Sequence, residues 1–156
     1  MLIGSKLPPL KTDRTYFHSG RAAFAFLVEH LARPRKVYLP TFTCWSLVDA
    51  IIRRFPHIEL VFYPVHRDLT CHYPSHLEKD EALVFIHFFG HENLSPLPKG
   101  EGLLIEDFSH SYLSQIHPRG HFVFGSYRKI MKVADGGFLR GFHNPVYEPS
   151  RKLDSW

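Results

Sequence analysis

The chain has 156 residues, and its share of hydrophobic (44%) and charged (22%) residues is that of one folded globular domain, which excludes a disordered chain. Its formal charge is +4, but the lysines and arginines are scattered rather than clustered, so we do not expect nucleic-acid binding. No apolar run has membrane-spanning length and the first residues lack a signal-peptide pattern, so we expect a cytoplasmic protein that is not bound to membranes.

Predicted helices and strands alternate in the first part of the chain. Two segments with apolar residues at helical spacing predict helices over 19–32 and 44–55. Short apolar runs of strand length occur at 36–39, 60–65, 82–88, 103–106 and 121–127. The polar segment 91–102, rich in proline and glycine, is predicted to be a loop.

The apolar strands carry few polar residues, which indicates that the sheet is buried on both faces. We therefore predict an α/β fold of three layers, in which helices cover a mostly parallel sheet. Residues 1–142 are predicted to form this domain and residues 143–156 a loose C-terminal tail.

Polar motifs follow several of the predicted strands. Such segments occur at 41–44, 87–90, 106–110 and 126–129. Because ligands of parallel α/β sheets bind beyond the carboxyl ends of the strands, we expect these segments to meet at one cleft. The two cysteines, Cys44 and Cys71, lack the spacing of a metal or disulfide motif and are predicted to be reduced thiols.

A lysine and a carboxylate stand at two of these strand ends. Lys129 closes the sequence Ser-Tyr-Arg-Lys, and Asp107 closes Ile-Glu-Asp. Pyridoxal 5'-phosphate (PLP) needs an amine that holds its aldehyde as a Schiff base and an acid that keeps its ring nitrogen protonated. Lys129 and Asp107 are candidates for these roles, although Asp107 alone is compatible with a turn cap and Lys129 with a solvated basic loop.

A phosphate site is predicted at the start of the first helix. Ser19 and Gly20 open this helix, where free backbone N–H groups and the positive end of the helix attract an anion. Ser19 is also compatible with a simple helix cap. Of the twelve histidines, His87 and His91 have the spacing of a helical metal pair but straddle a strand end, so we predict no metal site.

The order of these motifs resembles the DegT/StrS-type PLP-dependent sugar aminotransferases, which have the fold type I aminotransferase fold. The resemblance rests on Ser-Gly at a helix start, Pro-Thr-Phe-Thr-Cys, Val-Phe-Ile-His-Phe-Phe-Gly, Ile-Glu-Asp, and Ser-Tyr-Arg-Lys with Asp-Gly-Gly. It runs from about His18 to Leu139. Members of the family continue well beyond this length, so the resemblance covers only their N-terminal part.

The resemblance implies a role for each matching residue. Lys129 corresponds to the Schiff-base lysine, Asp107 to the partner of the pyridine nitrogen, and His110 to the residue near the phenolic oxygen. Backbone N–H groups of Gly20 and Arg21 and the Ser126 hydroxyl would bind the phosphate. The strand end at His87 and Gly90 matches a family motif for which we expect a structural role.

The chain also departs from the family pattern. Cys44 stands where the family commonly has an aromatic residue stacked on the cofactor ring, and Trp45 follows it, so both are candidate contacts of the ring. The glycine motif after the lysine is altered and the Ser126 to Lys129 spacing is short, which leaves Lys132 as an alternative lysine. The link between the strands at His87 and Glu106 is also short, so one packing layer is expected to be thin.

The resemblance implies that the protein transfers an amino group from an amino acid donor to a keto-sugar, which we expect to be nucleotide-linked. It further implies PLP as cofactor and either a homodimer or a complementing C-terminal chain as partner. The alternative is a non-catalytic remnant or half-enzyme that keeps the fold, and with it PLP binding, but depends on a partner chain for activity.

Overall fold

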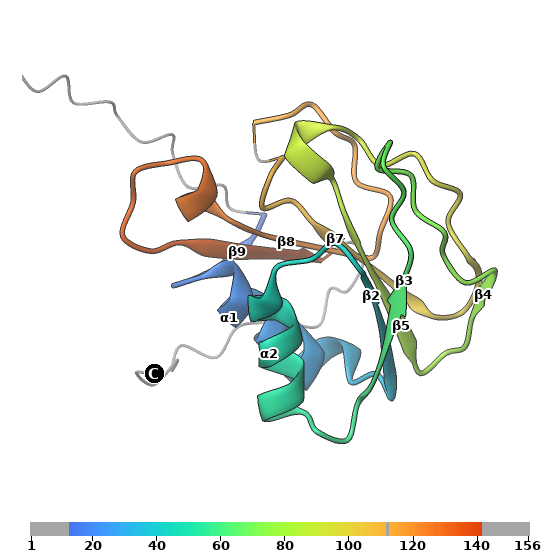
Figure 1. Ribbon diagram of the computed structural model, residues 1–156. Helices are drawn as coiled ribbons and strands as arrows, with labels where there is room; N and C mark the ends of the chain where they lie inside the picture. Colours follow the sequence, from blue (N-terminus) through green and yellow to red (C-terminus); the bar gives the residue numbers. More distant parts are fainter. Residues whose placement is uncertain (1–12, 112, 142–156) are drawn as a thin grey trace, which may run out of the picture.

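The computed structural model describes residues 13–111 and 113–141, and within them a twisted sheet of seven strands forms the centre of the molecule (Figure 1). Across the sheet the strands follow the order β1-β9-β8-β7-β5-β2-β3. Their bounds are β1 (Thr15–Phe17), β2 (Lys36–Pro40), β3 (Glu59–Tyr63), β5 (Glu81–Ile86), β7 (Leu103–Asp107), β8 (Phe122–Ser126) and β9 (Gly137–Gly141).

The five strands from β3 to β8 in this order are parallel, and β9 and β1 join the sheet by antiparallel pairing. Parallel strands end at the same edge of a sheet, so the segments that follow β2, β5, β7 and β8 are brought to one side. β3 is an outer strand with a partly exposed surface, and the ring of Phe62 is 46% exposed. The predicted burial of this strand on both faces was therefore wrong: Tyr63 is its one buried residue, and the strand has a neighbour on one side only among the described residues.

Helices cover one face of the sheet. Figure 1 shows α1 (Gly20–Phe26) and α2 (Trp45–Arg54) on the same side, and α1 continues directly into the π-helical segment η1 (Leu27–Ala32). Apolar side chains of these helices pack on the sheet in the larger core, which includes Phe24, Leu27, Val48, Ile51, Val84, Ile105 and Phe124. The predicted helix over 19–32 is thus one helical stretch whose second half is wound more loosely.

Irregular segments cover the opposite face. Tyr63, Tyr73, Leu77, Leu83 and Phe85 form a second core there, under the segments that carry the short strands β4 (His76–Leu77) and β6 (Lys99–Gly100). The single turn η2 (Phe88–Gly90) follows β5. Here the predicted thin layer consists of loops that bury the sheet without a long helix.

Four strands were not predicted: β1, β9, and the small pair of β4 and β6. The polar loop predicted at 91–102 contains β6 but is otherwise irregular. The tail predicted at 143–156 lies outside the described residues. No helix in the described part of the chain is long and apolar enough to cross a membrane.

Candidate functional site

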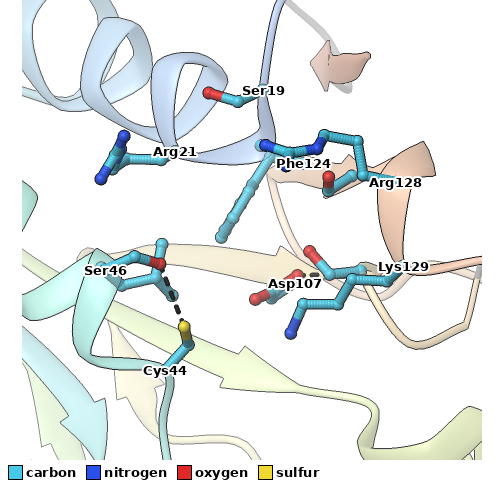
Figure 2. Close-up of a pocket in the computed structure, with 12 residues that line it drawn as sticks. Ser19, Arg21, Cys44, Ser46, Asp107, Phe124, Arg128 and Lys129 are labelled. Carbon is cyan, nitrogen blue, oxygen red and sulfur yellow. Dashed lines mark hydrogen bonds between the residues drawn. The ribbon is translucent and has the colours of Figure 1, made fainter. Parts of the chain in front are cut away.

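A pocket of about 400 Å³ lies where the carboxyl ends of β7 and β8 meet the N-termini of α1 and α2 (Figure 2). It is lined by Ser19, Gly20, Arg21, Cys44, Ser46, Leu47, Asp107, Ser109, Phe124, Ser126, Arg128 and Lys129. Three of the four predicted motif segments therefore contribute to it. Residues 87–90 do not line the pocket.

The first wall of the pocket is the start of α1. Ser19 has extended backbone and accepts a hydrogen bond from the Ala22 N–H at 3.1 Å, so it is the N-cap of the helix. Gly137 of β9 passes directly beneath, since a Cβ atom there would lie 2.2 Å from the Ser19 carbonyl carbon. Only glycine allows this approach, which fixes the helix start against the end of the sheet.

Asp107 is the last residue of β7 and points into the pocket (Figure 2). Its side chain is buried and accepts one backbone hydrogen bond at 2.7 Å, from the Ser109 N–H. Burial raises the pKa of the Asp107 carboxyl, while the Ser109 hydrogen bond and the nearby charge of Lys129 oppose that rise. A cation placed against this carboxylate would relieve its desolvation.

Glu106 precedes Asp107 in the chain but belongs to a different network on the other face of β7. Its Oε2 lies 2.7 Å from Nε2 of the fully buried His87, and Oε1 accepts the backbone N–H groups of Arg119 and Gly120. His87 Nδ1 accepts the Asn93 N–H at 3.1 Å, so the Nε2 nitrogen carries the proton that is donated to Glu106. His87 and Glu106 thus hold two loops on the sheet, which agrees with the structural role expected for His87.

Lys129 stands at the end of a single 3₁₀ turn, η3 (Tyr127–Lys129), that follows β8. The Gly136 carbonyl accepts the Tyr127 N–H at 3.0 Å, and the Gly136 N–H donates to the His18 carbonyl at 2.8 Å. Gly136 has a φ of 125°, which explains a glycine at this position. These bonds tie the lysine turn to the segment that opens α1. Lys132, the alternative lysine, is exposed and does not line the pocket.

His110 does not line the pocket but contacts its lysine. Its Nε2 lies 3.0 Å from Nζ of Lys129. The imidazole also stacks on the ring of Phe89, with centroids 5.6 Å apart and an angle of 15° between the planes. Burial and the neighbouring Lys129 lower the pKa of His110, and Asp107 acts in the opposite direction.

The start of α2 supplies Cys44 but not Trp45. The Cys44 sulfur lies 3.1 Å from the Ser46 hydroxyl, and Figure 2 shows both side chains at the pocket. The Ser46 hydroxyl and N–H lower the pKa of the Cys44 thiol, and the charge of Lys129 adds to this effect. Trp45 is 69% exposed and is not among the lining residues.

The structure thus brings six of the eight predicted site residues into one pocket, and His110 contacts it through Lys129. Sequence reasoning missed the pocket-lining residues Ser46, Leu47, Ser109, Phe124 and Arg128. The position of Arg128 in the sequence Tyr-Arg-Lys gives no signal for the pocket.

The charge of the pocket is mainly positive. Arg21, Arg128 and Lys129 line it together with one acid, Asp107. No ion pair involves the three cations within residues 13–111 and 113–141. Among the same residues, no group of three or more His, Cys, Asp or Glu side chains is arranged to hold a metal. The arrangement can attract an anion and present one amine to a carbonyl carbon.

No protein-family model and no curated protein sequence matches this chain. Among solved structures, it is similar to an aminotransferase from Psychrobacter cryohalolentis, with a TM-score of 0.60 and 15% identity over 82% of this chain and 37% of that one. A sugar aminotransferase from Micromonospora echinospora gives a TM-score of 0.61 and 14% identity, over 82% of this chain and 41% of that one. A serine palmitoyltransferase from S. paucimobilis with bound PLP gives a TM-score of 0.51 and 15% identity, over 85% of this chain and 38% of that one.

These similarities confirm the predicted fold, because three structures with little sequence identity share the mostly parallel α/β arrangement. The chain spans only 37 to 41% of the length of these proteins. They include aminotransferases of more than one kind and do not single out the DegT/StrS type.

Proposed function

We propose that the pocket binds PLP and that the chain provides the cofactor half of an aminotransferase site. The observation that carries this proposal is the position of Lys129 and Asp107. Asp107 ends β7, Lys129 lies in the turn after the adjacent parallel strand β8, and both line one pocket beneath the start of α1. The similar structures with this fold include aminotransferases and a PLP-bound enzyme.

The buried carboxylate of Asp107 fits the ring of this cofactor. Its pKa is raised by burial, and no ion pair relieves it within the described residues. A protonated pyridine nitrogen beside the carboxylate would supply the missing positive charge and favour the ionised form. Asp107 would in turn keep that nitrogen protonated.

The opposite end of the pocket fits a phosphate. The backbone N–H groups of Gly20 and Arg21 at the start of α1 and the Ser126 hydroxyl are the groups that we propose to contact it. Arg128 lines the same pocket and adds a guanidinium group whose two parallel N–H donors suit phosphate oxygens. Cys44 lines the wall near the proposed ring position, whereas the exposed Trp45 has no contact with the pocket.

PLP supplies an electrophilic carbonyl carbon and a ring that accepts electrons from an attached amino substrate. Lys129 would contribute the amine that binds the cofactor's aldehyde, and its freed amine would move a proton during amino transfer. His110 would approach the phenolic oxygen. The proposed donor is an amino acid and the proposed acceptor a keto-sugar, nucleotide-linked, by analogy with the sugar aminotransferase of similar fold.

We further propose that a second chain, as a homodimer or a complementing C-terminal chain, completes the substrate side in the cytoplasm. Phe42, Trp45 and Phe89 are each more than half exposed and lie on the segments that follow β2 and β5. Exposed apolar side chains of this kind are suited to cover by a partner.

The proposal is tested by titrating the purified protein with PLP, trapping with borohydride and determining the mass of the modified peptide. We expect one adduct on the Lys129 peptide that Lys129→Ala abolishes and the matched control Lys132→Ala retains. Asp107→Asn should weaken PLP retention by at least about tenfold, as expected when a charged partner of the bound ring is lost. Adduct on many surface lysines, unchanged by Lys129→Ala, would contradict the proposal.

The second candidate function, a non-catalytic half-enzyme, is separated by a further step of the same experiment. Loaded protein is mixed with amino acids, and formation of the amine form of the cofactor is followed by absorbance. Conversion by this chain supports an enzyme. A Lys129 adduct without conversion of the cofactor supports the half-enzyme if addition of a second chain restores that conversion.

A further inference from the structure

A second basic side chain, that of His110, lies in direct contact with the amine of Lys129. Nζ of Lys129 lies 3.0 Å from Nε2 of His110, and the two residues come from the segments after neighbouring parallel strands, β8 and β7. Because an ammonium only donates hydrogen bonds, Nε2 accepts from it and the other imidazole nitrogen carries the proton. His110 therefore places its basic nitrogen directly against the reacting atom of the lysine.

Phe89 holds the other side of this imidazole. Its ring lies parallel to that of His110, with an interplanar angle of 15°. The Phe89 backbone has φ 53° and ψ 25°, a left-handed conformation that is unfavourable for a bulky side chain. The ring is nevertheless 63% exposed, so burial in the core does not explain why the chain keeps phenylalanine there.

The surroundings of His110 keep it neutral. Burial and Lys129 lower its pKa, so the imidazole is deprotonated at neutral pH. The charged groups that face it are Lys129 and Asp107, and Cys44 senses the same two charges. The Nδ1 nitrogen is buried and has no hydrogen-bond partner among the described residues, so His110 is anchored by its ring stack and by Lys129.

We propose that His110 is the proton shuttle of Lys129 and that Phe89 is a positioning residue which holds the shuttle in place. The ammonium of Lys129 first passes one proton through His110 Nε2 to solvent, which leaves Nζ with a lone pair. When Nζ then attacks a carbonyl carbon, a C–N bond forms, the π bond of the carbonyl breaks, and the nitrogen must lose one further proton. His110 Nε2 accepts that proton and returns it to the carbonyl oxygen, which leaves as water after gaining a second proton from solvent. The shuttle deepens the proposed function, but its test uses an aldehyde without phosphate.

The test measures capture of pyridine-4-carboxaldehyde, trapped with excess cyanoborohydride between pH 5 and 8. Adducts on the Lys129 peptide are quantified by mass against those on exposed Lys99 in the same sample. We expect Lys129 to react at least about tenfold faster than Lys99 at pH 7, within the range of general acid-base catalysis. His110→Gln should reduce the rate of Lys129 to that of Lys99.

The pH dependence separates a proton shuttle from a structural contact. The rate ratio of the unmodified protein to His110→Gln should be constant at neutral pH. It should fall toward one in the acidic range, at a pH lower than that at which an ordinary histidine titrates, because the pKa of His110 is lowered. A ratio that does not change with pH would overturn the shuttle, because glutamine keeps a polar contact but does not titrate.

The role of Phe89 is tested with variants that are compatible with folding. Phe89→Gly suits the left-handed backbone and removes the ring, so the fold should persist while the Lys129 rate falls severalfold; Phe89→Tyr should retain the rate. Phe62→Ala removes a similarly exposed ring from the edge strand β3 and should have no effect. An unchanged rate in Phe89→Gly would overturn the positioning role.

PLP titration of the same variants distinguishes this inference from the proposed function. A fast, pH-dependent Lys129 that does not retain PLP supports the shuttle and contradicts the cofactor site. PLP retained on a Lys129 that is no faster than Lys99 contradicts the shuttle alone.

Discussion

Glu106 and Asp107 are neighbouring acids on β7, and both side chains are buried, yet their surroundings differ completely. Glu106 contacts the imidazole of His87 and two backbone N–H groups. Asp107 receives one backbone N–H from its own turn and faces a pocket lined by cations. Because successive residues of a strand point to opposite faces, one step along β7 separates a structural acid from a candidate functional one.

The contrast shows how a carboxylate that stabilises the fold differs from one that is available to a ligand. A buried acid whose oxygens are all hydrogen-bonded within the protein contributes to stability. A buried acid with few partners lowers stability, and such a group is a reasonable candidate for binding something outside the chain. Substitutions at the two acids should therefore have different effects on stability and binding.

The largest effect is expected for Glu106→Ala. The substitution removes the acceptor of the fully buried His87 and of the N–H groups of Arg119 and Gly120, so the free energy of unfolding should fall by about 3–5 kcal/mol. Urea denaturation measures this loss. A loss below about 1 kcal/mol would contradict the structural role of Glu106.

Asp107→Asn should change the free energy of unfolding in the opposite direction. The amide keeps an acceptor for the Ser109 N–H but is not charged, so the free energy of unfolding at pH 7 should rise by about 0.5–2 kcal/mol. The same variant loses PLP retention if the proposed function holds. Destabilisation similar to that of Glu106→Ala would show that Asp107 is an ordinary structural acid.

The gain in Asp107→Asn should depend on pH. The pKa of Asp107 is raised in the folded state, so the native protein favours the protonated carboxyl; its contribution to stability is complete below about pH 3.9 and is lost as the pH rises through the folded pKa. The difference in unfolding free energy between the variant and the unmodified protein should therefore grow from pH 4 to pH 8. A difference that shrinks over this range would contradict the raised pKa.

The smallest effect is expected at Cys44, which reports the charge of the pocket. The pKa of its thiol is lowered mainly by Ser46 and to a smaller extent by Lys129, whereas burial and, more weakly, Asp107 raise it. Asp107→Asn should therefore speed alkylation of Cys44 by iodoacetamide about twofold at pH 7. Glu106→Gln should leave this rate unchanged, and the buried Cys71 serves as the internal reference.

Much of the fold was predictable because its central strands are short apolar runs. β5 is buried along its whole length, and β7 is apolar up to its two acids, so period and length identify both. β1 has three residues and β9 begins and ends with glycine, so neither carries a strand signal. Their pairing depends on contacts between the two ends of the described chain, which a local pattern does not contain.

The residues of the candidate site that lie at strand ends were predictable. Those whose position depends on the local backbone conformation were not. Asp107 and Lys129 follow from the rule that ligands bind beyond parallel strands. Cys44, rather than Trp45, lines the pocket because it is the N-cap of α2, and one residue further the side chain is directed to solvent. The left-handed Phe89 gave no signal, because this conformation is normally predicted from glycine or asparagine.

The contact of Gly137 with Ser19 has a consequence for how the protein is made. During synthesis the start of α1 leaves the ribosome early, but the strand on which it rests is among the last of the described elements to emerge. The pocket wall can therefore take its final form only after β9 has inserted between β8 and β1. A nascent chain stalled before Gly137 would hold Asp107 and Lys129 without the strand on which the start of α1, the first wall of the pocket, rests.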